Sequence, residues 1–377
     1  MSGSREDLPP STARGERGER GEREESARRA RVKSMPGAMS RLLQTFVVAL
    51  TLCCAIFFGP SPASASAIPI LEQRSLEDFA SPGPYHMGTM MIDAPKASAF
   101  RPSYGYAPIV VYYPVDAPGA QTLALGAAGA NGTRGATPPT FHAIGFAHGA
   151  GAQAEYYTGL YAHMVSHGFV VTSVRNMAPV PATLGDDMCH GLAWILAESE
   201  GRGLYGEESM FFGRVATEGV GTMGHSMGGG GSIHCAMNWP QKVRAVAPIH
   251  PAPGGPPHLI YAPMMVPTGS LDFVTSPMMV KAAVFDGSPS PKIMPIMNGV
   301  AHREPVNYAG ANRWHPYLAA FFSLYLKRDF SAAMLVWGEE VGSLARDSRI
   351  SVAHRNKVRP QHSFCAQSFT HSPTGQD

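Results

Sequence analysis

The sequence of 377 residues predicts an α/β protein in which helices flank a mostly parallel central sheet. Residues 214–222 have a weak strand pattern, and residues 232–239 carry apolar side chains at helical spacing before Pro240 ends the helix. Residues 243–249 are a continuous apolar run that predicts the next strand, and residues 141–147 predict an earlier one. Strands and helices that alternate in this way favour a parallel sheet.

A Gly-x-Ser-x-Gly pattern at residues 224–228 lies between the predicted strand and the predicted helix. In this pattern a strand turns sharply into a helix, so that Ser226 projects from the sheet and the helix amides point toward a developing oxyanion. The two glycines prevent a collision between the strand and the helix. A phosphate-binding loop is the alternative for a glycine-rich run, but the Lys-Ser/Thr ending is absent. Strand, sharp turn, helix and strand form the core unit of an α/β-hydrolase, although the pentapeptide alone can also arise by chance.

The acid of a Ser-His-Asp triad is expected after the nucleophile in this fold. Residues 262–271 predict a short buried strand, and Asp272 follows it in a loop. A carboxylate there can accept a hydrogen bond from a histidine ring and stabilise the imidazolium that forms during catalysis. The alternatives are a loop-capping role for Asp272 and a catalytic role for Asp286, which precedes a solvated turn.

The base is expected last in the chain. His302 follows an apolar strand and a loop of small residues that begin at residue 293, so His302 is the leading candidate. His315, at the start of a predicted helix, and His250, at the end of the strand after the nucleophile helix, are the alternatives.

An oxyanion hole needs two backbone amides. The strand at residues 141–147 leads into a glycine-containing loop at residues 148–153, where the amide of Ala150 is the candidate donor. The amide of Met227 is its expected partner, and the competing interpretation of the loop is a purely structural turn.

Six segments resemble the bacterial cutinase and poly(ethylene terephthalate) hydrolase-like branch of the dienelactone-hydrolase group. They are residues 223–232, 165–171, 272–277, 299–305, 81–85 and 110–114, and the resemblance extends over about residues 80–330. It implies an α/β-hydrolase fold with Ser226 as nucleophile, Asp272 as acid and His302 as base, and with an oxyanion hole from the Met227 and Ala150 amides. The C-terminal disulfide of this family has no counterpart that can be assigned here.

Two positions depart from the family pattern. Ala150 stands where the polyester hydrolases carry a tyrosine, and Ala252 stands where they carry a tryptophan, so the aromatic clamp for aryl polyesters is missing. Core packing is the expected role of Tyr156, Tyr157 and Trp239. We therefore expect an aliphatic or lipid-like ester as the small-molecule or polymeric substrate.

A second resemblance, to the chlorophyllases, rests on residues 146–149 and 156–171. Those enzymes usually carry an arginine after the nucleophile, and Met227 at that position favours the cutinase branch. A chlorophyllase-like ester hydrolase is the alternative enzyme, and a catalytically silent α/β-hydrolase that serves as a binding module is the alternative without activity.

Composition indicates neither a nucleic-acid partner nor a cofactor. The formal charge is +2, and beyond residue 41 the chain holds 20 basic and 21 acidic residues. Of the five cysteines, Cys53 and Cys54 lie in an apolar run; Cys189, Cys235 and Cys365 remain without a Cys-x-x-Cys pair, so no metal site is expected. We expect Cys235 to pack as a small hydrophobic side chain. The oligomeric state stays open.

The N-terminal region predicts export. Residues 1–41 form a charged leader that we expect to be disordered, and residues 42–67 combine an apolar core with an Ala-x-Ala site typical of a cleaved signal peptide. An uncleaved signal anchor, with membrane contact through residues 42–58, and a bipartite plastid-targeting sequence are the alternatives. The hydrolase domain is expected at residues 80–330, followed by a C-terminal extension at residues 331–377.

Overall fold

The computed structural model describes residues 73–93, 108–125, 140–175, 180–306, 313–339 and 341–356. The predicted leader and signal segment therefore lie outside the described residues. Within the described part of the chain, no helix has the length and apolar character needed to cross a membrane.

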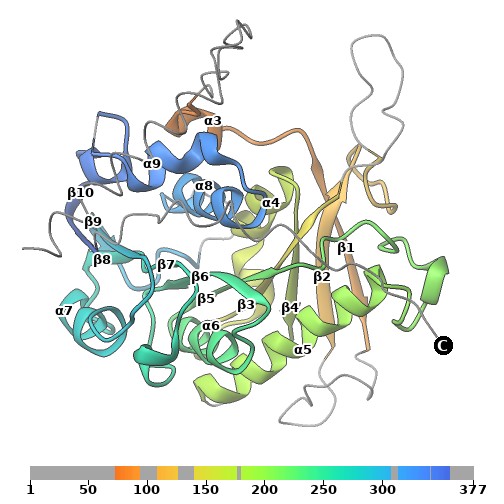
Figure 1. The fold of residues 1–377 in the computed structure, drawn as a ribbon, viewed down its shortest axis with the longest axis horizontal. Coiled ribbons are helices and arrows are strands. Elements are labelled where there is room, and N and C mark those ends of the chain that lie inside the picture. The colour runs from red at the N-terminus through yellow and green to blue at the C-terminus, as the bar shows by residue number, and fades with distance from the viewer. Residues whose placement is uncertain are drawn as a thin grey trace, which may run out of the picture. The chain divides into compact units, whose positions relative to one another are not determined.

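Ten strands of the described residues form one sheet, in the order β1-β2-β4-β3-β5-β6-β7-β9-β10, with β8 also paired to β9 (Figure 1). The pairs from β4 through β9 are parallel, whereas β1, β2 and β10 join antiparallel at the two edges. This is the α/β-hydrolase fold with the mostly parallel sheet that the sequence predicts. The strands are β1 (His86–Ile92), β2 (Ile109–Val115), β3 (His142–Ala147), β4 (Phe169–Val174), β5 (Val220–His225), β6 (Val243–Ile249), β7 (Met264–Met265), β8 (Thr268–Leu271), β9 (Lys292–Ala301) and β10 (Ile350–Arg355).

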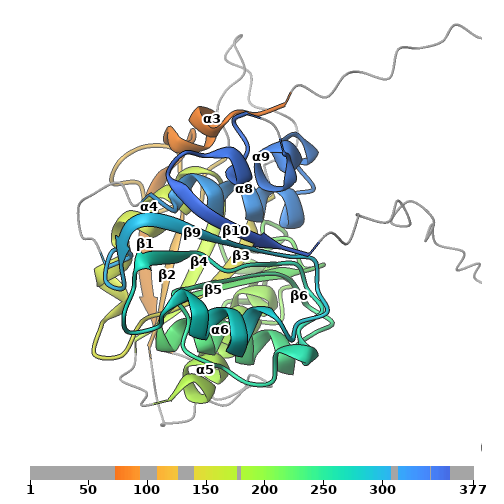
Figure 2. The ribbon, with the colours of Figure 1, turned by 90° about the vertical axis from the view of Figure 1, so that its left-hand side faces the viewer.

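Helices cover both faces of the sheet (Figure 2). On one face, α5 (Pro181–Ser199) and α6 (Met227–Asn238) contribute to one buried apolar cluster. On the other face, α4 (Thr158–Ser166) and α8 (His315–Leu326) contribute to a second cluster. The shorter elements are α3 (Leu76–Ala80), α7 (Pro277–Val280), α9 (Ala333–Trp337), η1 (Ala154–Tyr157), η2 (Gly206–Glu208), η3 (Pro257–Leu259), η4 (Lys281–Phe285), η5 (Phe330–Ala332) and η6 (Leu344–Arg346).

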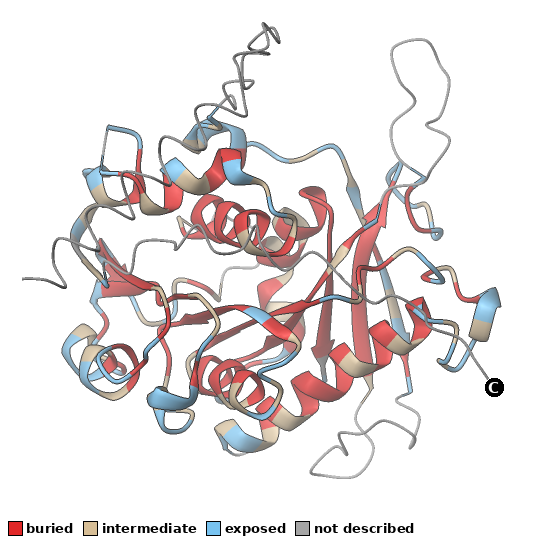
Figure 3. Ribbon diagram, viewed as in Figure 1, coloured by how far each residue is buried: buried red, intermediate tan, exposed pale blue. Residues whose placement is uncertain are grey.

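Burial follows this layered arrangement, because the central strands and the inward surfaces of the helices are buried (Figure 3). Every residue of β2 and β5 is buried, as expected for strands that are covered on both faces. Polar groups at the carboxyl ends of such strands can therefore be held in a dry, rigid frame.

The segment after residue 330 contributes to the fold. β10 pairs antiparallel with β9, and Leu335 and Val336 of α9 belong to the apolar cluster that contains α8. The sheet thus continues into the region that the sequence suggested as a C-terminal extension, because the edge of β9 offers backbone groups for one more strand.

A disulfide joins Cys189 of α5 to Cys235 of α6, with 5.6 Å between the Cα atoms. Cys235 is buried in the apolar cluster of α5 and α6, as expected, but it is also bonded to Cys189, which the sequence did not indicate. The two cysteines are 46 residues apart in the chain, and only the packing of α5 against α6 brings them together.

Candidate active site

Ser226 occupies the sharp turn between β5 and α6. Its backbone has φ 56° and ψ −118°, and its amide donates to the carbonyl oxygen of Ile249 at 2.9 Å. Its own carbonyl oxygen accepts from the amides of Gly230 at 3.1 Å and Ala252 at 2.9 Å. A positive φ is costly for a residue with a side chain and persists only where surrounding contacts impose it. These three hydrogen bonds hold the strained turn and fix the direction of the serine side chain.

The turn at residues 224–228 forms the elbow, and its glycines are required by close backbone contacts. A Cβ atom added at Gly224 would lie 2.1 Å from the carbonyl oxygen of Gly228, and one added at Gly228 would lie 2.1 Å from that of Ala147. The strand, the helix and the end of β3 are thus in direct backbone contact, as the sequence pattern predicts.

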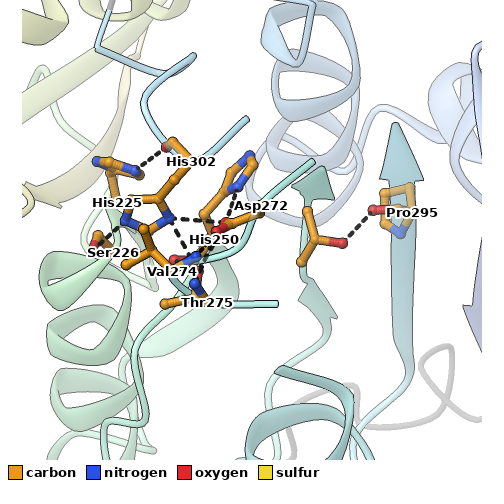
Figure 4. A network of polar contacts seen from close by, with 9 residues as sticks. His225, Ser226, His250, Asp272, Val274, Thr275, Pro295 and His302 are labelled. Atoms are coloured by element: carbon orange, nitrogen blue, oxygen red, sulfur yellow. Dashed lines mark hydrogen bonds and ion pairs between the residues drawn. The ribbon is translucent and has the colours of Figure 1, made fainter. Parts of the chain in front are cut away.

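Ser226, His302 and Asp272 form a continuous hydrogen-bonded chain (Figure 4). The Ser226 Oγ lies 2.9 Å from Nε2 of His302, and Nδ1 of His302 lies 2.9 Å from Oδ2 of Asp272. An ionised carboxylate can only accept, so Nδ1 of His302 carries the proton and Nε2 accepts from the serine hydroxyl. This is the arrangement in which a histidine can remove the serine proton.

Asp272 ends up at the centre of this network because it follows β8 at the carboxyl edge of the sheet. Its side chain is buried, and Oδ1 accepts from the amides of Val274 at 2.9 Å and Thr275 at 2.8 Å. Oδ2 accepts from both His302 and His250. Burial acts to raise the pKa of Asp272, but these hydrogen bonds outweigh burial and hold the pKa well below its ordinary value. The carboxylate is therefore ionised throughout the neutral range.

The two alternative bases do not contact Ser226. His250 is fully buried, and its Nδ1 lies 2.7 Å from Oδ2 of Asp272. His315 begins α8, is buried, and stacks on His163 with 5.1 Å between the ring centroids. The alternative acid, Asp286, is exposed and pairs with Lys281 at 2.6 Å. The structure thus brings together Ser226, Asp272 and His302 and leaves the alternatives to other contacts.

The loop after β3 borders the nucleophile. A Cβ atom added at Gly149 would lie 3.3 Å from Cβ of Ser226, so the backbone next to Ala150 lies against the serine. Met227 is the first residue of α6, where amides have no acceptor within the helix. The two expected oxyanion donors therefore belong to segments next to Ser226, one in a loop and one at a helix N-terminus.

Residues 131–292 match the family model described as PET hydrolase-like. The expected resemblance is confirmed over these residues. The match indicates an ester hydrolase with the α/β-hydrolase fold, and it includes Ser226 and Asp272, whereas His302 lies beyond it. No curated protein matches the chain significantly.

Relative to the PET hydrolase-like pattern, the positions of the aromatic clamp carry small side chains. Ala150 is exposed, and Ala252 is half-buried next to Ser226, to whose carbonyl oxygen its amide donates. Trp239 follows the last residue of α6, so the helix separates it from Ser226 by about 18 Å. Trp239 is therefore too distant to replace a clamp ring, in agreement with its expected packing role.

Tyr157 and His225 form a buried link that sequence reasoning missed. The amide of Gly149 donates to the Tyr157 hydroxyl at 3.0 Å, and this hydroxyl lies 2.8 Å from Nδ1 of His225. Nε2 of His225 lies 2.8 Å from the carbonyl oxygen of His302. The Gly149 amide only donates and the His302 carbonyl only accepts, so the hydroxyl donates to Nδ1, and Nε2 carries the proton of a neutral His225.

This link connects the loop that carries Ala150 to the backbone of the candidate base. Burial lowers the pKa of His225 well below its ordinary value, and the neighbouring rings of His250 and His302 lower it further. His225 therefore stays neutral, as the hydrogen-bond directions require. A signal was present in the sequence, because His225 precedes the elbow serine, but nothing in the sequence indicated that Tyr157 would reach it.

Proposed function

We propose that the protein is a serine carboxylester hydrolase that acts through an acyl-enzyme on aliphatic or lipid-like esters, and that it is exported from the cell. The observation that carries the catalytic part of this proposal is the Ser226–His302–Asp272 chain, with 2.9 Å at each link. The family match supports ester hydrolysis, and the proposal adds the serine mechanism, the substrate class and the location.

In the first half-reaction the Ser226 Oγ attacks the ester carbonyl carbon, and its proton passes to Nε2 of His302. Asp272, which already accepts from Nδ1, stabilises the imidazolium that forms. The amides of Met227 and Ala150 are the proposed donors to the oxyanion. His302 then returns the proton to the leaving alcohol, and the acyl group stays on the serine.

In the second half-reaction water replaces the alcohol. His302 accepts a proton from the water as the oxygen attacks the acyl carbon, and the same proton returns to Ser226 when the carboxylic acid leaves. No cofactor is needed for either step.

The loop that carries the acid supports an apolar substrate. Phe273, Val274 and Met278 have exposed fractions of 86%, 66% and 82%. Phe273 and Val274 directly follow Asp272, and Met278 lies in α7, which begins at the end of this loop. Exposed apolar side chains that gather beside a candidate site favour contact with an apolar ligand. With the clamp rings absent, an alkyl chain gains about 0.8 kcal/mol for each buried methylene, whereas an aryl ester lacks stacking at Ala150 and Ala252.

A fluorophosphonate probe tests the serine mechanism. It should label the full-length protein rapidly and should not label the Ser226→Ala variant, because only an activated serine reacts quickly. Ser226→Ala and His302→Ala should each reduce esterase activity by several orders of magnitude, whereas His315→Ala should keep most of it. A folded wild-type protein that resists the probe would be a binding module instead.

A panel of p-nitrophenyl esters of increasing chain length, a terephthalate ester and a chlorophyll tests the substrate class. Aliphatic esters should exceed the terephthalate ester by about tenfold in kcat/KM, which corresponds to about 1.4 kcal/mol. The double variant Ala150→Tyr with Ala252→Trp should narrow that gap. An unchanged gap in a folded double variant would show that the two alanines do not determine substrate choice, and preferred cleavage of chlorophyll would favour the alternative enzyme.

Export is tested separately by N-terminal sequencing of protein made in its own host. The mature chain should begin near Ser66 or Ile68, after the Ala-x-Ala site. An intact N-terminus in a carbonate-resistant membrane fraction would indicate a signal anchor, and an intermediate form in a plastid would indicate bipartite targeting.

A further inference from the structure

His250 has an unusual and rigidly held backbone. It directly follows β6, it has φ 45°, and among the described residues it is one of three non-glycine residues with a positive φ. Ser226 is another, and it directly follows the neighbouring parallel strand β5. The His250 amide donates to the carbonyl oxygen of Pro267 at 2.8 Å, and the Thr275 Oγ1 donates to the His250 carbonyl oxygen at 2.9 Å. Backbone strain that surrounding contacts impose is concentrated at functional sites, so the strained backbone of His250 indicates that this residue has a role in the candidate site.

The side chain of His250 shares one carboxylate oxygen with the candidate base. Oδ2 of Asp272 lies 2.7 Å from Nδ1 of His250 and 2.9 Å from Nδ1 of His302 (Figure 4). The carboxylate can only accept, so both Nδ1 atoms carry protons and both rings donate to the same oxygen. The Thr275 Oγ1 also lies 2.9 Å from this oxygen.

His250 is held in its neutral form. Its ring is fully buried, and its Nε2 has no hydrogen-bond partner among the residues that the structure describes. A proton on Nε2 would therefore be a buried, unsatisfied donor on a charged ring. Burial lowers the pKa of His250, and the Asp272 carboxylate only partly opposes this effect. His250 thus remains a neutral donor to Asp272.

We propose that His250 is a positioning residue that fixes Asp272 and takes up part of its negative charge, so that Asp272 attracts the proton of His302 less strongly. The inference rests on the proposed function, because it assigns His250 a part in the same site. In the resting enzyme His302 must be unprotonated to act as a base. A carboxylate that is shared between two imidazoles stabilises the imidazolium of His302 less and therefore extends activity to lower pH.

Other ionisable groups lie near the rings of His250 and His302, but Asp272 is the charged group that is hydrogen-bonded to both rings. His225, from the end of β5, is neutral and bound to Tyr157 and to the His302 carbonyl oxygen. Glu304, from the loop after β9, acts on His250 electrostatically and pairs with Arg313 at 2.7 Å. Arg303, adjacent to His302, is exposed. None of these groups donates to Oδ2 of Asp272 in the described contacts.

The test compares two variants of the full-length enzyme. In His250→Asn the side-chain amide can donate from near the position of Nδ1, and asparagine tolerates a positive φ. In His250→Leu the donor is removed. The measurement is kcat/KM for a soluble p-nitrophenyl ester as a function of pH, with the folded state of each variant checked by thermal unfolding.

We expect the acidic limb of the His250→Leu profile to move to higher pH by about one unit, a tenfold change in proton affinity. The limb of His250→Asn should remain within a few tenths of a unit of the wild type. Equal limbs in all three proteins would overturn the proposal even if kcat/KM falls, because a purely structural role lowers the plateau without moving the limb. Equal shifts in both variants would also overturn it, since the donor would then be irrelevant.

Proton NMR of the wild type provides a measurement that needs no folded variant at position 250. Two imidazole N–H protons, from His250 and His302, should appear strongly downfield, and the His302→Ala protein should retain one of them. A single downfield proton in the wild type that disappears in His302→Ala would contradict the shared oxygen. The NMR result does not depend on esterase activity, so failure of the proposed function, seen as absent fluorophosphonate labelling, is distinguishable from failure of this inference.

Discussion

The Tyr157→Phe variant tests whether the buried link between the loop at residues 148–153, which carries the proposed oxyanion donor Ala150, and the proposed base His302 matters for catalysis. Phenylalanine fills the same space and removes only the hydroxyl, which accepts from the Gly149 amide at 3.0 Å and lies 2.8 Å from Nδ1 of His225. Tyr157 is fully buried, and both partners are buried as well, so water cannot replace the lost hydroxyl.

The expected loss of stability follows from the two groups that the variant leaves without a partner, the Gly149 amide and Nδ1 of His225. Each buried donor or acceptor that loses its partner costs about 1–3 kcal/mol, so the free energy of unfolding should fall by about 2–6 kcal/mol. The freed Gly149 amide precedes Ala150, the proposed oxyanion donor, and the freed His225 ring holds the His302 carbonyl oxygen. We therefore expect kcat to fall by about tenfold, the result of a loss of about 1.4 kcal/mol in transition-state stabilisation.

The matched control is Tyr113→Phe. The Tyr113 hydroxyl donates to the carbonyl oxygen of Gln121 at 2.8 Å, and Tyr113 lies in β2, remote from β5 and its elbow in the strand order. This variant should lose about 1 kcal/mol of stability and keep its kcat. The assay is chemical unfolding together with p-nitrophenyl ester hydrolysis at a temperature where both variants are folded. Equal kcat values for the two variants would refute the link as a catalytic element.

Three further outcomes are expected. Reduction of the Cys189–Cys235 disulfide, which closes a loop with a sequence separation of 46, should lower stability by about 4 kcal/mol and Tm by about 10 °C; an unchanged Tm would show that the reduced chain is equally stable. Burial, reinforced by the nearby His163, lowers the pKa of His315 to about 3, so its contribution to stability is complete above about pH 6.5 and is lost as pH falls toward 3. About 2 kcal/mol should disappear between pH 7 and 5, and His315→Gln should flatten this pH dependence whereas the exposed-site variant His258→Gln should not. Gly228→Ala should abolish activity or folding, because the added Cβ would lie 2.1 Å from a backbone oxygen, and an active variant would contradict the elbow packing.

Local sequence patterns predicted the positions of strands correctly where the pattern arises within a single segment of the chain. The apolar run at residues 243–249 coincides with β6, and the run at residues 141–147 includes β3. The helix predicted at residues 232–239 begins earlier in the structure, at Met227. Four glycines fill its first turns, and their low helix propensity is overridden because they let α6 approach its neighbours closely.

The strand predicted before Asp272 divides into β7 and β8. Pro267 lies between them, and a proline interrupts the backbone pairing of a strand because it has no N–H to donate. Asp272 nevertheless follows the last of these strands, so the position of the carboxylate at the edge of the sheet is the expected one.

The sequence by itself determined the α/β-hydrolase fold, the strained turn at Ser226, and the chain order of Ser226, Asp272 and His302. These features depend on local spacing: glycines around a serine, and polar residues directly after apolar strands that share one sheet edge. The tertiary structure alone decided that His250 donates to Asp272, that Tyr157 reaches His225, and that Cys189 meets Cys235. Each of these contacts joins residues 22–68 positions apart, and their distances are set by how strands and helices pack rather than by any pattern within one segment.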